Sequence, residues 1–189
     1  MKNHYTLLLV VILSFASCKN EKKETKIVEA ETENIEVVAP KTLNIALQAK
    51  SKSNVSGNVL FIEKDGMVTM TATMSGLESG IHAIHIHTSS DCSSPDGKSA
   101  GGHWNPTAQP HGKWGAETGF HKGDIGNFSA DETGNGSITF TTDQWCIGCG
   151  DETKDILGKG IIVHAGADDL TSQPSGAAGA RVSCAGIIE

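Results

Sequence analysis

Two histidines of the segment HAIHIH, residues 82–87, have a spacing that suits a metal ion. His85 and His87 are separated by one residue, and in a β-strand this spacing puts both side chains on the same face. Imidazole is the commonest metal ligand among protein side chains, so a single ion could contact both rings. The same spacing also arises by chance in strands. Taken alone, these residues favour the simpler interpretation of buried, hydrogen-bonded histidines.

A second group of potential ligands follows in the chain. His103, His111 and His121 precede Asp124, and three neutral imidazoles with one carboxylate make a plausible tetrahedral zinc site. The intervals of eight, ten and three residues leave enough chain to surround one ion from several directions. The stretch that contains them, residues 88–135, shows no strand pattern, and so long a loop in a compact domain is usually functional. A metal or a disulfide would hold it in place.

The elements that must position these groups have the pattern of strands. Apolar residues alternate with polar ones or run together in short segments bounded by glycine, and no segment shows a sustained helical period. Such strands, with 22 glycines available for tight turns, favour an antiparallel β-sandwich or barrel. Two of the strands flank a turn at Lys64-Asp65-Gly66. The predicted strands lie within residues 42–49, 57–77, 80–87, 136–142, 158–165 and 180–188.

Composition and charge narrow the function. The chain has 189 residues, 38% of them hydrophobic, so one globular domain with short additional segments is expected. Its formal net charge of −7 at pH 7 leaves no basic stripe, which argues against nucleic acid as a partner. An anionic substrate would need a local positive feature to approach so acidic a protein.

The N-terminus has the pattern of a processing signal. Lys2 precedes the apolar stretch YTLLLVVILSFAS, which is too short to span a bilayer comfortably. Residues 14–18, SFASC, resemble a bacterial lipobox, in which the cysteine is lipidated and becomes the first residue of the mature protein. We therefore expect residues 1–17 to be a lipoprotein signal peptide and Cys18 to carry lipid. The alternative is an ordinary secretory signal, cut nearby, that leaves Cys18 free.

A charged segment separates this signal from the domain. Residues 18–40 contain no aromatic residue and too few apolar residues to bury a face, so we expect a flexible tether that Pro40 closes. The domain then comprises residues 41–189. Lipid would attach the protein to a membrane in the cell envelope outside the cytoplasm, on the periplasmic side or the cell surface, where disulfides persist.

Six segments form an ordered pattern along the chain: GIHAIHIH, SAGGHWNP, HG, HKGDIGN, GIIVHAGADDL and PSGAAGARVSC. Their order and approximate spacing resemble those of copper/zinc superoxide dismutases, from about residue 42 to residue 189. The resemblance implies a Greek-key β-sandwich or barrel of about eight antiparallel strands, with long metal-binding and channel loops. The implied reaction is the dismutation of superoxide to dioxygen and hydrogen peroxide by a copper ion that alternates between Cu(II) and Cu(I).

The resemblance also implies one copper and one zinc ion per chain, joined by a shared histidine. His103 would bridge the two ions as an imidazolate and, together with Arg181 beside the copper, would be catalytic. Arg181 would guide the anion, because its guanidinium stays protonated at any working pH. The implied copper ligands are His85, His87, His103 and His164. The implied zinc ligands are His103, His111, His121 and Asp124.

Further positions acquire roles from the same resemblance. Asp168 matches a carboxylate that links a copper histidine to a zinc histidine, and such partners fix the orientation of ligand rings. His82 matches a histidine that is not a ligand and braces the active-site loops by hydrogen bonds. Cys92 would pair with Cys184 and tie the long loop to the last strand. Family dimers use different faces, so the resemblance permits a homodimer without locating its interface.

One insertion departs from the family pattern. The segment WCIGCGDE, residues 145–152, stands where the family usually has a short loop. Cys146 and Cys149 have the spacing of a thioredoxin-type redox pair, but no helix pattern follows that would lower a thiol pKa. We interpret them first as a local disulfide, second as a site that captures a soft metal and third as a catalytic dithiol.

Three classes of function remain to be compared. The first is an enzyme, a lipid-anchored superoxide dismutase, and the second is a non-catalytic copper- or zinc-binding lipoprotein on the same scaffold. The third, a structural adhesion-type sandwich, would leave the histidines unexplained. A homologue that has lost catalysis is expected to lack a copper histidine or the arginine, and this chain has all of them. The sequence therefore favours the enzyme.

Overall fold

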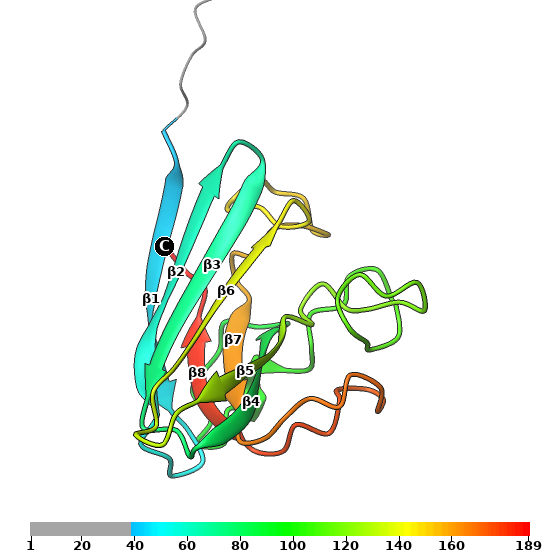
Figure 1. Ribbon diagram of the computed structural model, residues 1–189. Coiled ribbons are helices and arrows are strands. Elements are labelled where there is room, and N and C mark those ends of the chain that lie inside the picture. The colour runs from blue at the N-terminus through cyan, green and yellow to red at the C-terminus, as the bar shows by residue number, and fades with distance from the viewer. Residues whose placement is uncertain (1–38) are drawn as a thin grey trace, which may run out of the picture. The chain divides into compact units, whose positions relative to one another are not determined.

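Eight strands form a closed, all-β barrel in the computed structural model, which describes residues 39–189 (Figure 1). The strands are β1 (Lys41–Ala49), β2 (Ser56–Lys64), β3 (Met67–Ser75), β4 (Gly80–His87), β5 (Gly126–Ala130), β6 (Gly136–Thr142), β7 (Gly160–His164) and β8 (Arg181–Gly186). The predicted signal peptide, the lipidation site Cys18 and residues 18–38 of the tether lie outside the described residues. Within residues 39–189, no helix has the length and apolar character needed to cross a membrane.

The strand order confirms the predicted fold class. Around the barrel the order is β1-β2-β3-β6-β5-β4-β7-β8, and all neighbours pair antiparallel. Strands β4, β5 and β6 are consecutive neighbours and β7 returns beside β4, which is a Greek key. Two seams are narrow: β5 and β6 share a single residue pair, and β1 and β8 share two. The barrel therefore consists of two four-stranded sheets, β1-β2-β3-β6 and β5-β4-β7-β8, packed around one core.

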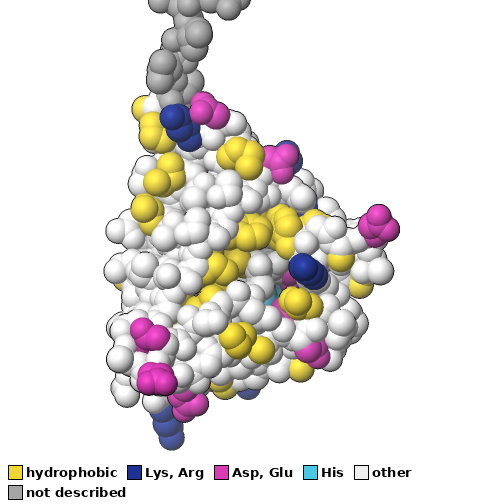
Figure 2. Space-filling view, viewed as in Figure 1, with side chains coloured by type: hydrophobic (Ala, Val, Ile, Leu, Met, Phe, Trp, Pro, Cys, Tyr) yellow, Lys and Arg dark blue, Asp and Glu magenta, His cyan; other side chains and the backbone are white. Residues whose placement is uncertain are grey.

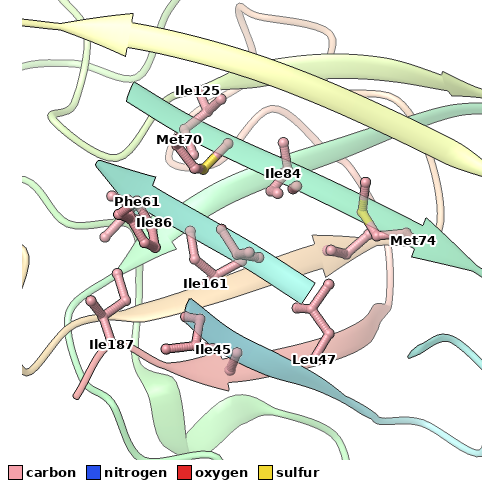
Figure 3. Close-up of a cluster of buried hydrophobic side chains, with 14 of the residues drawn as sticks. Ile45, Leu47, Phe61, Met70, Met74, Ile84, Ile86, Ile125, Ile161 and Ile187 are labelled. Atoms are coloured by element: carbon pink, nitrogen blue, oxygen red, sulfur yellow. The ribbon is translucent and has the colours of Figure 1, made fainter. Parts of the chain in front are cut away.

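Alternating side chains along the first sheet build that core. In β3 the inward residues Val68, Met70, Ala72 and Met74 are at most 4% exposed. Figure 3 shows Met70 and Met74 of β3 packed with inward isoleucines of the second sheet. The β2–β3 hairpin turns where the sequence predicted it, at Asp65-Gly66, whose φ values of 51° and 76° fit a two-residue type I′ turn.

One strand lies where none was expected. The sequence showed no strand pattern between residues 88 and 135, yet β5 occupies five of these residues, and a short 3₁₀ helix, η1 (Lys98–Ala100), occupies three others. The prediction was wrong because only Phe128 and Ala130 of β5 are buried, and so short an apolar pattern cannot be distinguished from a loop. Pairing with β4 holds β5 in the sheet.

Strand β4 divides the core from the opposite face of its sheet. Ile84 and Ile86 belong to the main core, and alternation places His85 and His87 on the other face. Both long loops, residues 88–125 after β4 and 165–180 after β7, start and end on this second sheet and project on the same side of the barrel (Figure 1). The loops therefore cover the face that carries the two histidines.

Three backbone hydrogen bonds lock the first long loop onto β4. Ile86 N–H donates to Gly123 O (2.9 Å), Gly123 N–H donates to Trp104 O (3.0 Å), and Trp104 N–H donates to Ile86 O (2.8 Å). This Ile86–Trp104–Gly123 junction lies next to His103 and Asp124 in the chain. Glycine is required at its third position, because a Cβ on Gly123 would lie 2.1 Å from Ile86 O.

We expect Gly123→Ala to lower the free energy of unfolding by about 1–3 kcal/mol, the usual cost of forcing extra carbon into packed structure. The added Cβ would meet Ile86 O and Trp104 N, two backbone groups that cannot rotate away. Urea unfolding of the metal-free protein measures the change. Gly102→Ala is the matched control, since a Cβ on Gly102 meets nothing within 4 Å. Equal stability of the two variants would contradict the steric role of Gly123.

Candidate metal centre

Four histidines from two strands and one loop meet beside the second sheet. His85 and His87 come from β4, and the antiparallel pairing of β4 with β7 brings His164, at the end of β7, alongside them. His103 comes from the long loop, where it forms an isolated bridge with His87. One ligand atom from each ring lies within 4.8 Å of the others. The four residues are at most 8% exposed, and Figure 2 accordingly shows very little histidine surface.

A second group adjoins the first and shares His103 with it. His103, His111, His121 and Asp124 each offer one atom, and these atoms also lie within 4.8 Å of one another. The Asp124 carboxylate is fixed on both sides: Oδ1 lies 2.8 Å from His103 Nδ1, and Oδ2 accepts the N–H groups of His121 (2.8 Å) and Gly112 (3.1 Å). The structure thus brings together the residues expected to bind zinc, as it does those expected to bind copper.

Six imidazole nitrogens in these groups are buried without a hydrogen-bond partner. An unpaired buried polar atom costs about 1–3 kcal/mol, so these atoms need partners of another kind. Nδ1 of His111 and Nδ1 of His121 lie 3.0 and 3.2 Å from Asp124 oxygens without hydrogen-bond geometry, as atoms that face one ion would. Four nitrogens suit copper, and three nitrogens with one carboxylate suit zinc. The six atoms are His85 Nδ1, His87 Nε2, His103 Nε2, His111 Nδ1, His121 Nδ1 and His164 Nε2.

The protein holds the second ring nitrogen of several of these histidines. His87 Nδ1 donates to Gly101 O at 2.9 Å. His85 Nε2 donates to Asp168 Oδ2 at 2.8 Å, and His111 Nε2 donates to Asp168 Oδ1 at 2.9 Å. Such bonds fix the tautomer and leave a lone pair on the opposite nitrogen of each ring. Asp168 therefore connects one histidine of the first group with one of the second.

Two amide side chains that the sequence analysis did not single out hold this network. Asn127 Nδ2 donates to Asp168 O and Asp168 N–H donates to Asn127 Oδ1, both at 2.8 Å. Gln173 Nε2 donates to His111 O and His111 N–H donates to Gln173 Oε1, both at 2.9 Å. Each amide thus binds the backbone of a residue from a distant part of the chain. The only signal in the sequence was the position of Asn127 close behind Asp124.

His82 lies apart from both groups. It is on β4, but two residues before Ile84 and therefore on the core side of the strand, opposite Phe128 of β5. Its Nδ1 lies 2.9 Å from His164 O and its Nε2 lies 2.8 Å from Glu78 O. The ring therefore joins the start of β4 to the end of β7, where the second long loop begins.

An open pocket of about 430 Å³, lined by four histidines and Arg181, leads to the first group. Arg181 pairs with His164 across β7 and β8, and its Nη1 donates to Gly97 O at 2.8 Å. The Cys92–Cys184 disulfide ties the loop that carries Gly97 to β8, in agreement with the pairing that the resemblance implied. The disulfide therefore helps to hold the carbonyl that orients the guanidinium.

Burial favours the neutral form of His85 and His164. Desolvation lowers the pKa of His85 to about 4, although its hydrogen bond to Asp168 acts in the opposite direction, and desolvation lowers the pKa of His164 to about 3. For Asp124 and Asp168, burial alone would raise the pKa, but the hydrogen bonds that each carboxylate accepts outweigh it and lower the pKa. Neutral imidazoles and ionised carboxylates are the forms that bind metal ions.

Comparisons with known proteins agree with this geometry. A family model described as copper/zinc superoxide dismutase (SODC) matches residues 55–187. A crystal structure of a double mutant of a SOD-like protein from Bacillus subtilis, with a tyrosine and a proline replaced by histidine, is 28% identical, with a TM-score of 0.69. A mutant of a SOD-like protein from Bacillus subtilis with only the proline replaced is 27% identical, with a TM-score of 0.69. Each match covers 77% of this chain and 97% of the other.

We expect Asp168→Asn to weaken zinc binding about 10- to 100-fold, the usual effect of removing a hydrogen-bond partner of a metal ligand. The asparagine offers one acceptor where the carboxylate serves two imidazole N–H groups, so His85 or His111 loses its partner. Competition with a chromophoric chelator measures the affinity. Asp169→Asn is the control, because the hydrogen bonds given for the Asp169 carboxylate go to Thr171 and Ser172 in its own turn and not to a histidine. Equal affinities for the two variants would exclude this role for Asp168.

The metal-free protein is expected to lose stability as the pH falls from about 7 to about 4. In the unfolded chain the pKa of a histidine is about 6.5. In the folded protein the pKa is about 4 for His85 and about 3 for His164. Between these values the unfolded state binds more protons, so the free energy of unfolding rises with pH and is lost on acidification. His85 alone accounts for up to about 3 kcal/mol.

Urea unfolding at several pH values measures this dependence. His85→Gln, which cannot titrate, should show a shallower loss of stability on acidification than the native sequence. A free energy of unfolding that does not change across this pH range would show that the histidines are not buried in neutral form.

Proposed function

The chain belongs to the copper/zinc superoxide dismutase family, and on that premise we propose that it is a superoxide dismutase, an oxidoreductase that converts superoxide to dioxygen and hydrogen peroxide. The observation that carries the proposal is the set of six buried, unpartnered imidazole nitrogens in two adjoining groups. In a purely structural sandwich, unpaired polar atoms in the interior would only lower the free energy of unfolding. Two metal ions would satisfy all six.

Each group would hold one ion, with His103 shared between them. His85, His87 and His164 would complete the copper site, and His111, His121 and Asp124 would complete the zinc site. Bound copper supplies one-electron redox chemistry, while zinc supplies a fixed positive charge without redox chemistry. Asp168 would fix the position of one site relative to the other, because it accepts hydrogen bonds from His85 of one and His111 of the other.

Arg181 would attract and orient the anionic substrate. The protein carries a formal net charge of −7, so superoxide needs a local cation to approach the site. Burial lowers the pKa of Arg181, but a guanidinium remains charged at any working pH. Its bond to Gly97 O fixes one side of the group in the wall of the pocket that leads to the copper histidines. The position allows an anion to bind beside His164 and His87.

His103 is the residue suited to moving a proton. Its Nδ1 faces Asp124 in the zinc group, and its Nε2 is unpartnered in the copper group. If both nitrogens served as metal ligands, the ring would carry no proton of its own. Nε2 would then be the ring atom able to accept a proton, one of the two that hydrogen peroxide requires. His103 also lines the open pocket, so water can restore that proton.

A non-catalytic metal-binding protein on the same scaffold is the second candidate function. It is supported by the solved relatives, whose descriptions call them SOD-like and report histidines introduced by mutation. The present chain has six histidines and Asp124 at the seven positions of the two groups, and an arginine in the pocket. These residues favour the catalytic function.

We further propose that the protein acts outside the cytoplasm, held to a membrane by lipid on Cys18. Two disulfides in residues 39–189, Cys92–Cys184 and Cys146–Cys149, support a location where thiols are oxidised. The lipobox-like segment SFASC supports the anchor.

We expect Arg181→Ala to slow catalysed superoxide decay about 10-fold or more and to weaken its dependence on ionic strength, because the steering charge is lost. Pulse radiolysis of the copper- and zinc-loaded protein measures the decay directly. Arg181→Lys keeps a positive charge and should retain part of the rate, whereas His85→Ala should abolish catalysis. Native protein that binds both metals and does not accelerate the decay would refute the dismutase and favour the metal-binding function.

A further inference from the structure

The insertion of residues 145–152 and the turn that follows it place three potential ligands together outside the two histidine groups. A disulfide joins Cys146 to Cys149, which was the first of the interpretations drawn from the sequence. Asp155 lies beside them, and one of its carboxylate oxygens and the two sulfur atoms are all within 4.8 Å of one another. The sequence does not distinguish Asp155 as a ligand, because it lies six residues beyond the second cysteine and other acidic residues lie nearby.

The loop keeps its shape through contacts other than the disulfide. Cys146 N–H donates to Lys154 O (2.9 Å), and Ile156 N–H donates to Cys146 O (3.1 Å). Trp145 Nε1 donates to Lys122 O at 2.8 Å, which joins the loop to the zinc-binding segment. The side chains that anchor the loop in the main core are Trp145, Ile147 and Ile156, all at most 4% exposed.

A disulfide between such close residues contributes little to stability. Its effect on the unfolded chain grows with the length of the closed loop, and Cys146–Cys149 spans 3 positions where Cys92–Cys184 spans 92. Loop closure therefore accounts better for Cys92–Cys184 than for Cys146–Cys149. The short separation leaves room for a chemical role of Cys146 and Cys149 as well.

Asp155 is held in a position to act as a third ligand. Its Oδ1 accepts the N–H groups of Gly148 (2.9 Å) and Leu157 (3.0 Å), while Oδ2 accepts that of Gly150 (2.9 Å). A carboxylate oxygen has two lone pairs, so Oδ2 keeps one for an ion. Asp155 lines an open pocket of about 500 Å³ and Cys149 is exposed, so an ion and a reductant can both reach the loop.

We propose that the reduced form of this loop is a second zinc site, with the thiolates of Cys146 and Cys149 and the carboxylate of Asp155 as ligands. A dithiol reductant opens it: the Cys146–Cys149 bond breaks, the protein gains two electrons and two protons as two thiols, and the reductant becomes a disulfide. Zn²⁺ then displaces both thiol protons, and water takes the fourth position. The site is independent of the proposed dismutase activity.

Thiolates bind both Zn²⁺ and Cu(I), and the carboxylate together with the charge of the donor set favours Zn²⁺. Two thiolates and a carboxylate carry three negative charges, of which a divalent ion neutralises more than a monovalent one. Zinc accepts sulfur and carboxylate ligands in one tetrahedron, and cysteines separated by two residues are a common spacing in its sites. The ion has no redox chemistry, so it does not reoxidise the thiolates to which it binds.

Co²⁺ is the probe for this site, because thiolate ligands give it strong near-ultraviolet charge-transfer absorption that imidazole and carboxylate ligands do not. The full-length protein is first saturated with Zn²⁺ in its disulfide form, which fills the histidine groups. It is then reduced with a phosphine and titrated with Co²⁺. We expect one thiolate-bound Co²⁺ per chain after reduction, displaced by further Zn²⁺, and none before reduction.

Variants assign the signal to the loop. The double variant Cys146→Ser/Cys149→Ser should lose the absorption, whereas Cys92→Ser/Cys184→Ser should keep it. Asp155→Asn should weaken Co²⁺ binding about 10-fold. Absence of thiolate absorption in the reduced native protein would overturn the site, and unchanged affinity in Asp155→Asn would overturn the third ligand. None of these readouts involves superoxide, so failure here is distinct from failure of the dismutase proposal.

Discussion

The Ile86–Trp104–Gly123 junction is the contact on which the metal centre depends. Its three hydrogen bonds form a closed ring among backbone groups that lie far apart in the sequence. Each member is next to a candidate ligand, so fixing the junction fixes the relative positions of His85, His103 and Asp124. Ordering a long loop is entropically costly, and the junction provides that order from the protein alone. The relative positions of these ligands are therefore set in part by backbone hydrogen bonds.

In three of the candidate ligands, the two ring nitrogens have different roles. One nitrogen of His85, His87 and His111 is occupied by a carboxylate or a carbonyl, which orients the ring. The other nitrogen is buried and unpaired, which is unfavourable until an ion binds. Asn127 and Gln173 orient the site less directly, because they bind the backbone of Asp168 and of His111 and not the imidazole rings.

Much of this arrangement leaves a local pattern in the sequence. The alternation of β3 and the Asp65-Gly66 turn predicted a hairpin, and the one-residue spacing of His85 and His87 predicted a shared face. That spacing alone still favoured ordinary buried histidines, and the family resemblance was needed to join them with His103.

Other features leave no such pattern. Strand β5 is short and has few apolar residues, so only its partner β4 defines it. Asn127 and Gln173 act through contacts between distant segments that fold side by side, which neither composition nor periodicity encodes. Asp155 acts within one irregular loop that has no periodic pattern. The oxygen of Gly97 that binds Arg181 belongs to the backbone, so no side-chain pattern indicates the contact.

The two sheets of the barrel share one apolar core but differ in the loops that they carry. Both long loops start and end on β5-β4-β7-β8, so the candidate ligands of the two histidine groups all belong to that half of the barrel and none lies on β1-β2-β3-β6. The halves meet at seams of only one and two residue pairs. Local opening of a protein follows such boundaries between cooperative units. Bound metal would therefore restrain directly only the half that carries the ligands, whereas the other half would depend on the shared apolar core.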